Sequence, residues 1–200
     1  MKEILPGVWS WSVFNQERGM NFNGHLVVND AGCVLIDPPA MGGDELVLAA
    51  SAGPPEAVVI TNRHHTRDGM TPAGQFRIRI LLHHLDAEAV PAGVRLGGTY
   101  KDGDMLPGGL QVITLQDQKS PGECALLCQR AGALLLGDAL IGKPAGALNL
   151  LPPEKYQDVA KARSGIRRLL DYSFESVLVG DGEPVLRGGR AAIESFLARS

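Results

Sequence analysis

Four polar groups in this sequence each follow a short apolar run. They are Asp37 after 34–36, the stretch 61–68 after 58–60, Asp138 after 134–137, and Asp181 after 177–180. Ligand and catalytic side chains gather where strands end, because loops converge there over a rigid sheet. A single aspartate after a strand is most often a turn residue. Four such groups in one chain of 200 residues indicate a shared site.

The stretch 61–68 carries the side chains with the widest chemistry. It holds His64, His65 and Asp68, whose imidazoles and carboxylate are ligands for divalent metals. It also holds Arg67, whose guanidinium binds carboxylates and phosphates. The stretch is therefore compatible with metal chemistry or the binding of anions.

The apolar runs are typical of short strands separated by glycine and proline, of which 25 and 13 are spread along the chain. The sequence Asn29-Asp30-Ala31-Gly32 predicts a hairpin turn. Expected strands cover 8–13, 22–28, 33–36, 57–60, 78–82, 110–115, 124–129, 133–136 and 177–179. Expected helices cover 44–50, 152–171 and 189–198, with a helical turn at 86–90. This pattern predicts two sheets packed between helices.

Composition bounds the class of protein. Hydrophobic residues make up 44% and charged residues 20% of the chain, so we expect one folded domain over residues 1–200. The formal charge of −3 argues against nucleic acid as a partner, because phosphate binding needs clustered cations. We expect neither a membrane span nor a secretory signal, because no apolar stretch is long enough. Three cysteines are too few for a disulfide scaffold, so we expect a reducing, cytoplasmic location.

Five short motifs occur in an order that resembles a known family. They are Leu35-Ile36-Asp37-Pro38, residues 61–67, Lys119-Ser120-Pro121-Gly122-Glu123, Leu135-Leu136-Gly137-Asp138 and Val179-Gly180-Asp181-Gly182. This order is similar to that of the metallo-β-lactamase superfamily, which includes glyoxalase II and many other hydrolases. The run 82–88 also looks like a segment of that family. The resemblance implies an α/β (α+β) fold, a four-layer αββα sandwich with its site along one edge.

The resemblance also carries over the seven positions that bind metal in the family. In chain order they fall on Asn62, His64, Thr66, Arg67, Lys119, Asp138 and Asp181. Only His64 and Asp138 keep the residue type of the family. The protonated side chains of Arg67 and Lys119 have no free lone pair and cannot bind a metal ion.

These replacements lead to a main hypothesis. Two cations, at positions 67 and 119, would face two carboxylates, at positions 138 and 181, so the pocket would be neutral without a metal. We expect a divergent member that has lost the dinuclear zinc site, has no metal cofactor and is not a zinc hydrolase. Its pocket would bind a small anionic or polar ligand. The expected pocket residues are Asn62, His64, Arg67, Lys119, Asp138 and Asp181, with Asp37, Thr61 and Glu123 supporting them.

A second interpretation is a metal-dependent hydrolase with a rearranged, mononuclear site. His64 or His65 would act with Asp138 and Asp181, and zinc or another divalent metal would activate water against an ester, thioester or amide. Adjacent histidines on an extended chain point in opposite directions, so both are not expected to bind one ion. His64 also has a structural interpretation, as a loop histidine bonded to the backbone.

A third interpretation is a scaffold or interaction protein with no chemistry in a pocket. An exposed apolar patch around Trp9, Trp11 and Phe14 would favour it. The two tryptophans are equally compatible with the core. The sequence does not determine an oligomeric state or the identity of a ligand.

Overall fold

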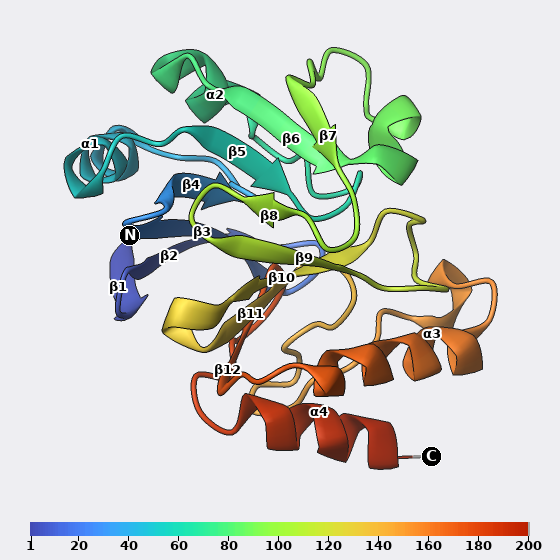
Figure 1. Cartoon of the computed structure of the whole chain (residues 1–200). Helices are drawn as coiled ribbons and strands as arrows, with labels where there is room; N and C mark the ends of the chain where they lie inside the picture. The colour runs from blue at the N-terminus through green and yellow to red at the C-terminus, as the bar shows by residue number, and fades with distance from the viewer. Residues whose placement is uncertain (200) are drawn as a thin grey trace.

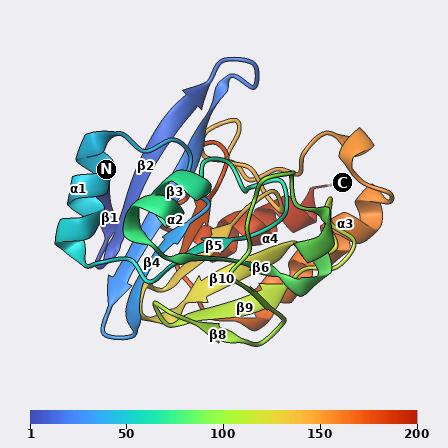
Figure 2. The same cartoon turned by 90° about the horizontal axis from the view of Figure 1, so that it is seen from above.

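The computed structural model describes residues 1–199 and contains two β-sheets that lie face to face (Figure 1). Helices α1 (Gly43–Ala52) and α2 (Met70–Phe76) cover the outer face of one sheet. Helices α3 (Val159–Ile166) and α4 (Gly189–Ala198) cover the outer face of the other sheet (Figure 2). The layers therefore run helix, sheet, sheet, helix, and the predicted αββα sandwich is confirmed.

The first sheet has seven strands in chain order. Strands β1 to β4 pair antiparallel, and β4 to β7 pair parallel. Every residue of β5 is buried, as expected for an apolar, β-branched run that is covered on both faces. The bounds are β1 Lys2–Leu5, β2 Val8–Asn15, β3 Met20–Asn29, β4 Gly32–Ile36, β5 Ala57–Ile60, β6 Arg79–His83 and β7 Gly98–Tyr100.

The second sheet has five strands in the order β12-β11-β10-β9-β8. Strands β8 to β11 pair antiparallel, whereas β11 and β12 pair parallel. The bounds are β8 Met105–Leu106, β9 Leu110–Thr114, β10 Cys124–Cys128, β11 Ala133–Leu136 and β12 Ser176–Val179.

The short strands at the sheet edges are the ones that sequence patterns did not predict. Strands β1, β7 and β8 contain four, three and two residues, too few to show an alternation of apolar and polar residues. The predicted turn at 29–32 does join β3 to β4. There the Asn29 side chain accepts a hydrogen bond from the Ala31 N–H at 2.8 Å.

The expected helix 152–171 is wrong in its extent. A 3-10 turn covers Pro153–Lys155, α3 begins only after Asp158, and a second 3-10 turn covers Arg167–Asp171. The Asp158 carboxylate accepts a hydrogen bond from the backbone N–H of Lys161 at 3.0 Å and so caps α3. The capping aspartate, rather than the proline pair, sets where the helix starts.

Helix α2 was not expected, because its segment contains Pro72 and Gly74. Pro72 is the third residue of the helix, where a missing backbone N–H has no partner to lose. Arg77 ends the helix in the left-handed conformation, with φ of 56°. A proline in the first turn is therefore compatible with a short helix here.

Three apolar clusters hold the layers together, one between the sheets and one under each helix pair. Trp11 is 6% exposed and belongs to the cluster under α1 and α2, whereas Phe14 on β2 is 61% exposed. Trp11 is therefore a core residue and is not part of the exposed apolar surface expected around Trp9, Trp11 and Phe14. Within residues 1–199, every helix is too short or too polar to cross a membrane.

The strand directions explain why the polar groups of the sequence meet. In each sheet the strands that precede these groups, β4 with β5 and β11 with β12, run parallel and end at the same edge. The sheets are joined at that edge by a bridge between Phe22 and Asp181 and by a 2.7 Å hydrogen bond from the Asn23 N–H to the Gly180 carbonyl. All four polar groups therefore lie at one edge of the sandwich.

Candidate functional site

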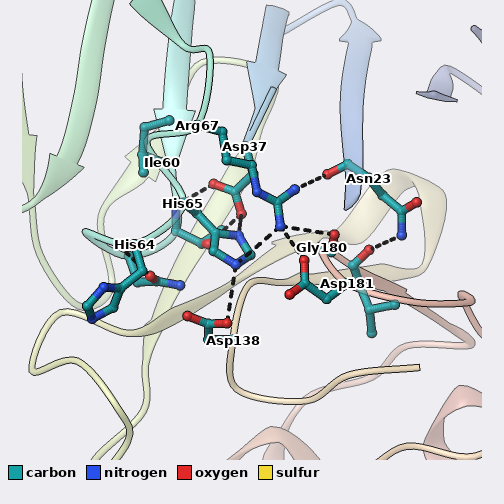
Figure 3. Close-up of polar contacts among 12 residues, drawn as sticks. Asn23, Asp37, Ile60, His64, His65, Arg67, Asp138, Gly180 and Asp181 are labelled. Atoms are coloured by element: carbon teal, nitrogen blue, oxygen red, sulfur yellow. Dashed lines mark hydrogen bonds and ion pairs between the residues drawn. The ribbon is translucent and has the colours of Figure 1, made fainter. Parts of the chain in front are cut away.

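Arg67 and Asp181 form a buried ion pair at the edge where the sheets meet (Figure 3). The guanidinium also donates from Nη1 to the Asn23 carbonyl at 2.8 Å and from Nη2 to the Gly180 carbonyl at 3.1 Å. It lies 4.7 Å from the centre of the Phe22 ring, in a cation–π arrangement. Arg67 thereby ties the loop after β5 to β3 and to the loop after β12.

The loop after β5 bends sharply to present its side chains. The His65 N–H donates to the Asn62 carbonyl at 3.0 Å, and Arg67 has a left-handed φ of 40°. That conformation costs a residue with a side chain about 1–2 kcal/mol, which the contacts of the guanidinium can offset. The imidazoles of His64 and His65 point in different directions, but from a turn rather than from an extended chain (Figure 3).

His65 lies at the centre of the site. Its Nδ1 is 2.8 Å from Asp37 Oδ2 and its Nε2 is 3.4 Å from Asp138 Oδ1. Thr61 holds Asp37 with its backbone N–H at 2.8 Å and its hydroxyl at 2.5 Å. Burial and Arg67 lower the pKa of His65, but the two carboxylates raise it further, to about 10. His65 is therefore an imidazolium near neutral pH.

The carboxyl groups of the site have different proton affinities. Burial raises the pKa of Asp37 and of Asp138, but the charge and hydrogen bonds of His65 lower both pKa values below the usual range. Burial keeps the pKa of Asp181 above its usual value, although His65 and Arg67 lower it. Asp37 and Asp138 are thus the carboxylates most strongly held in the charged form.

Lys119 pairs with Asp138 on the other side of the site. Lys119 Nζ lies 2.6 Å from Asp138 Oδ2. The lysine side chain is 22% exposed and the aspartate 4% exposed. Within residues 1–199 the amine makes no other hydrogen bond. Asp138 therefore lies between the cations of His65 and Lys119, and one face of the amine remains open.

Asn62 and Glu123 form a buried pair behind the ion pairs. Asn62 Nδ2 donates to Glu123 Oε1 at 3.2 Å, and Asn62 Oδ1 accepts from the His64 N–H at 2.9 Å. Burial raises the pKa of Glu123 well above its usual value and so favours the neutral form of this side chain. A Cβ at Gly137 would lie 2.2 Å from Thr61 Oγ1, so only glycine fits against this pair.

His64 lies at the mouth of the site. Its ring faces away from His65 (Figure 3) and makes no hydrogen bond to the part of the chain that the structure describes. Burial and the nearby Lys119 lower the pKa of His64, so its imidazole is neutral near pH 7. The bond from the ring to the backbone that the structural interpretation expects is therefore not found among residues 1–199; the hydrogen bond at this residue runs from its backbone N–H to Asn62 Oδ1.

A cavity of about 510 Å³ opens over these residues. Its wall contains five cationic and three anionic side chains, which leaves a net charge of +2 before His65 is counted, whereas the whole chain carries −3. The lining residues are Glu17, Arg18, Met20, Phe22, His64, His65, Arg67, Lys119, Asp138, Ile141, Lys143, Leu151, Pro152, Lys155 and Asp181.

The expected pocket residues divide into two groups. Those that line the cavity are His64, Arg67, Lys119, Asp138 and Asp181. Asn62 does not line it and lies behind it, fully buried, as do the supporting residues Asp37, Thr61 and Glu123.

The whole described chain matches one family. The model of the metallo-β-lactamase superfamily covers residues 1–199. The chain belongs to this superfamily. No curated protein matches the sequence. The membership expected from the order of the five motifs is confirmed.

Solved structures support the same fold. A metallo-β-lactamase from Pontibacter korlensis is 19% identical with a TM-score of 0.79, over 100% of this chain and 98% of that one. A metallo-β-lactamase from Erythrobacter litoralis, with β-mercaptoethanol in its active site, is 21% identical with a TM-score of 0.77, over 98% and 93%. TTHA1623 in a di-iron-bound form is 23% identical with a TM-score of 0.68, over 92% and 96%.

Di-iron binding in one structural neighbour raises the question of which residues here could hold a metal ion. Within residues 1–199, the single group with suitable geometry is His65, Asp138 and Asp181, whose ligand atoms all lie within 4.8 Å of one another. His64, the histidine that the family's motif places at a ligand position, is not part of the group. The metal-binding set that this chain offers is thus small and centred on His65.

Sequence reasoning missed three residues that organise the site. Asn23 and Phe22 hold Arg67, as described above. Asp86, fully buried, accepts hydrogen bonds from the backbone N–H groups of Arg63 at 2.9 Å and Gly122 at 3.1 Å, so it joins the two loops that flank the cavity. Asp86 could have been found from the sequence, because it lies in the run 82–88 that resembles a segment of the family. Nothing in the spacing of residues 22 and 23 indicated that they would contact Arg67.

Proposed function

We propose that this superfamily member binds a small anionic ligand in its cavity without a metal ion. In this proposal the dinuclear metal centre is lost, fixed side-chain charge takes its place, and the protein is not a zinc hydrolase. The charge of the cavity wall, +2 in a chain of −3, supports an anion as the ligand.

One observation carries the proposal: cations already occupy the carboxylates that would hold a metal. Arg67 pairs with Asp181, and Lys119 Nζ lies 2.6 Å from Asp138 Oδ2. A metal ion bound there would displace these cations and leave the largely buried Arg67 without its carboxylate, and breaking a buried pair in this way costs about 3–5 kcal/mol. Lys119, which is partly exposed, would lose its ion pair at a smaller cost.

The chemistry of the remaining donors also disfavours a dinuclear centre. The imidazolium of His65 has no free lone pair until it loses a proton. Asn62 and Glu123 are bonded to each other in the interior. A catalytic zinc ion typically takes about three protein ligands of its own. The group of three at His65, Asp138 and Asp181 is therefore too small for two ions.

Metal analysis tests the loss of the centre. Protein purified without a histidine tag is incubated with zinc, manganese or iron(II), passed through a desalting column and analysed by mass spectrometry of the metals. We expect far less than one ion per chain. The Lys119→Ala variant, which frees Asp138, should retain more metal than the wild type. Stoichiometric metal in the wild type would refute the proposal.

Titration with inorganic phosphate, followed by calorimetry, tests the binding of anions. We expect saturable binding that weakens at least tenfold in Lys119→Met. The matched control is Lys161→Met, because Lys161 is exposed on α3 and lies outside the cavity. Equal binding by the two variants would mean that phosphate binds elsewhere.

A second candidate is a metal-dependent hydrolase with one ion. The observation that favours it is the 4.8 Å grouping of His65, Asp138 and Asp181. These residues would hold the ion, which when bound would activate water against an ester, thioester or amide. Metal-stimulated turnover of thioester substrates that Asp138→Ala abolishes would favour this candidate over the first.

The proposal includes a cytoplasmic location. It is supported by the three cysteines, Cys33, Cys124 and Cys128, which are all free thiols and all buried. Cell fractionation followed by immunoblotting tests it, and recovery of the protein outside the cytoplasmic fraction would refute it.

A further inference from the structure

We propose that the ligand of this cavity is an amphipathic anion. Its charged group would bind at Lys119 and Lys155, and an apolar body would lie along Met20, Phe22 and Leu151. This inference rests on the proposed binding of an anion and adds the shape and polarity of the ligand.

Lys119 and Lys155 mark the charged end of the cavity. Both residues also line a second, smaller cavity of about 260 Å³, so they share one end of the first. Lys119 uses one N–H on Asp138, which leaves two for a ligand. The Lys155 side chain makes no ion pair or hydrogen bond to any residue from 1 to 199. An anion at this end would meet two amines with free donors.

Two of the three other cations of the wall, Arg67 and Lys143, are less available. The Arg67 side chain is 9% exposed, and its two terminal nitrogens donate to Asn23, Gly180 and Asp181. Lys143 Nζ donates to the carbonyls of Arg18 at 2.8 Å and Gly19 at 3.1 Å. These two groups hold the walls of the cavity together. Arg18, the third, is exposed in the turn before β3 and does not line the smaller cavity that Lys119 and Lys155 share, so we assign anion binding to the two amines at that end.

Apolar side chains from two segments line the rest of the cavity. Met20 and Phe22 come from the start of β3, and Ile141, Leu151 and Pro152 come from the loop after β11. The Leu151 N–H donates to the Tyr156 hydroxyl at 3.1 Å, which fixes this part of the loop. A ligand pocket typically combines apolar walls with a few placed polar groups. An inorganic anion would leave the apolar wall without a partner.

The experiment is a calorimetric titration with acetate, butyrate, hexanoate and octanoate at constant ionic strength. We expect the affinity to rise about fourfold for each added methylene, the factor for transfer of one CH₂ from water to an apolar wall. Octylamine, which has the same chain and the opposite charge, should not bind.

Two variants locate the apolar end. Met20→Ser and Leu151→Ser place a hydroxyl at half-buried positions, where the fold tolerates a polar side chain. Each should flatten the dependence on chain length, so that octanoate loses much more affinity than acetate does. Leu85→Ser is the matched control, because Leu85 is 52% exposed and lies outside the cavity. Thermal melting confirms that each variant is folded.

The outcomes separate this inference from the proposed function. If phosphate and all four carboxylates bind equally well, the anion site stands and the amphipathic ligand is refuted. If octylamine binds as well as octanoate, the charged end is refuted. If the wild type binds none of the anions, the proposed function is refuted and this inference with it. A chain-length dependence that Met20→Ser and Leu151→Ser remove supports the inference.

Discussion

The two ion pairs of the site, Arg67 with Asp181 and Lys119 with Asp138, flank His65 and differ in how firmly the protein holds them. Arg67 is 9% exposed, donates to two backbone carbonyls besides Asp181 and stacks on Phe22. Lys119 is 22% exposed and has Asp138 as its single partner within residues 1–199. Both cations stand at positions where the resemblance to the family implies metal ligands, but they differ in their surroundings.

The difference separates a structural role from a binding role. The guanidinium of Arg67 spans the junction of the two sheets with a planar set of donors, which a lysine cannot reproduce. The amine of Lys119 is a point charge with unused donors that face the cavity. We therefore expect changes at Arg67 to act mainly on stability, and changes at Lys119 mainly on ligand binding.

The largest expected effect comes from removing Arg67. Arg67→Ala should lower the free energy of unfolding by about 3–5 kcal/mol, because Asp181 is left buried and unpaired. Chemical denaturation measures this change. Arg67→Lys should recover part of it, and Asp181→Asn in the Arg67→Ala background should recover more. A loss below about 1 kcal/mol would contradict the structural role.

The next prediction uses the pH dependence of His65. Its pKa is raised to about 10 in the folded protein from an ordinary value of 6.5. This group's contribution to stability is therefore complete below pH 6.5 and is lost as the pH rises toward 10. For protein treated with a chelator, we expect a loss on the order of 3–5 kcal/mol between these limits.

The His65→Gln variant is the comparison for this loss at alkaline pH. Its free energy of unfolding should not fall in the same way as the pH rises toward 10, whereas the rest of its pH profile should match that of the wild type. Denaturation curves at several pH values measure it. A wild-type protein that is equally stable at pH 7 and pH 10 would show that His65 is not held as an imidazolium.

The buried His25 should give the opposite dependence of stability on pH. Burial lowers the pKa of His25 to about 4, although Asp37 raises it. Its contribution to stability is therefore present above pH 6.5 and is lost as the pH falls toward 4, by about 3 kcal/mol. His25→Leu should reduce this acid limb in the same denaturation series. An acid limb that the variant leaves unchanged would assign the loss to other groups.

A smaller effect on stability is expected at Lys119. Lys119→Met should lower the free energy of unfolding by about 1–2 kcal/mol, because the amine is partly solvated and Asp138 keeps His65 as a partner. Its effect on anion binding should exceed its effect on folding. A loss of stability as large as that of Arg67→Ala would contradict the distinction between a structural Arg67 and a ligand-binding Lys119.

The smallest effect is expected at a surface pair. Arg130 and Asp30 lie 2.7 Å apart with side chains 64% and 92% exposed. Arg130→Ala should change the free energy of unfolding by less than about 1 kcal/mol, because water screens such a pair. A larger change in chemical denaturation would mean that arginine loss in general, rather than the buried position of Arg67, accounts for the effects above.

Local sequence patterns predicted much of the fold. The runs at 34–36, 58–60 and 134–136 are strands because they are apolar and short, and turn residues bound them. The start of α3 was mispredicted because a proline pair and a capping aspartate compete as start signals within seven residues, and only packing selects between them. Strands β7 and β8 are too short to carry a pattern of their own.

The site was predicted less completely than the fold. The motif order identified Arg67, Lys119, Asp138 and Asp181 as residues of one site, but spacing alone does not state which cation pairs with which carboxylate. The central position of His65 was also hidden, because it depends on a turn in the loop after β5 and on Asp37 from another strand.

The amino-acid sequence by itself determined the superfamily and the layered fold, because residue type and order along the chain are local information. Only the tertiary structure decided that Arg67 joins the two sheets, that His65 lies between Asp37 and Asp138, and that the open amines of Lys119 and Lys155 share one end of a cavity. The physical reason is that pairing energies and proton affinities depend on distance and burial, which residues far apart in the chain acquire only when the sheets meet.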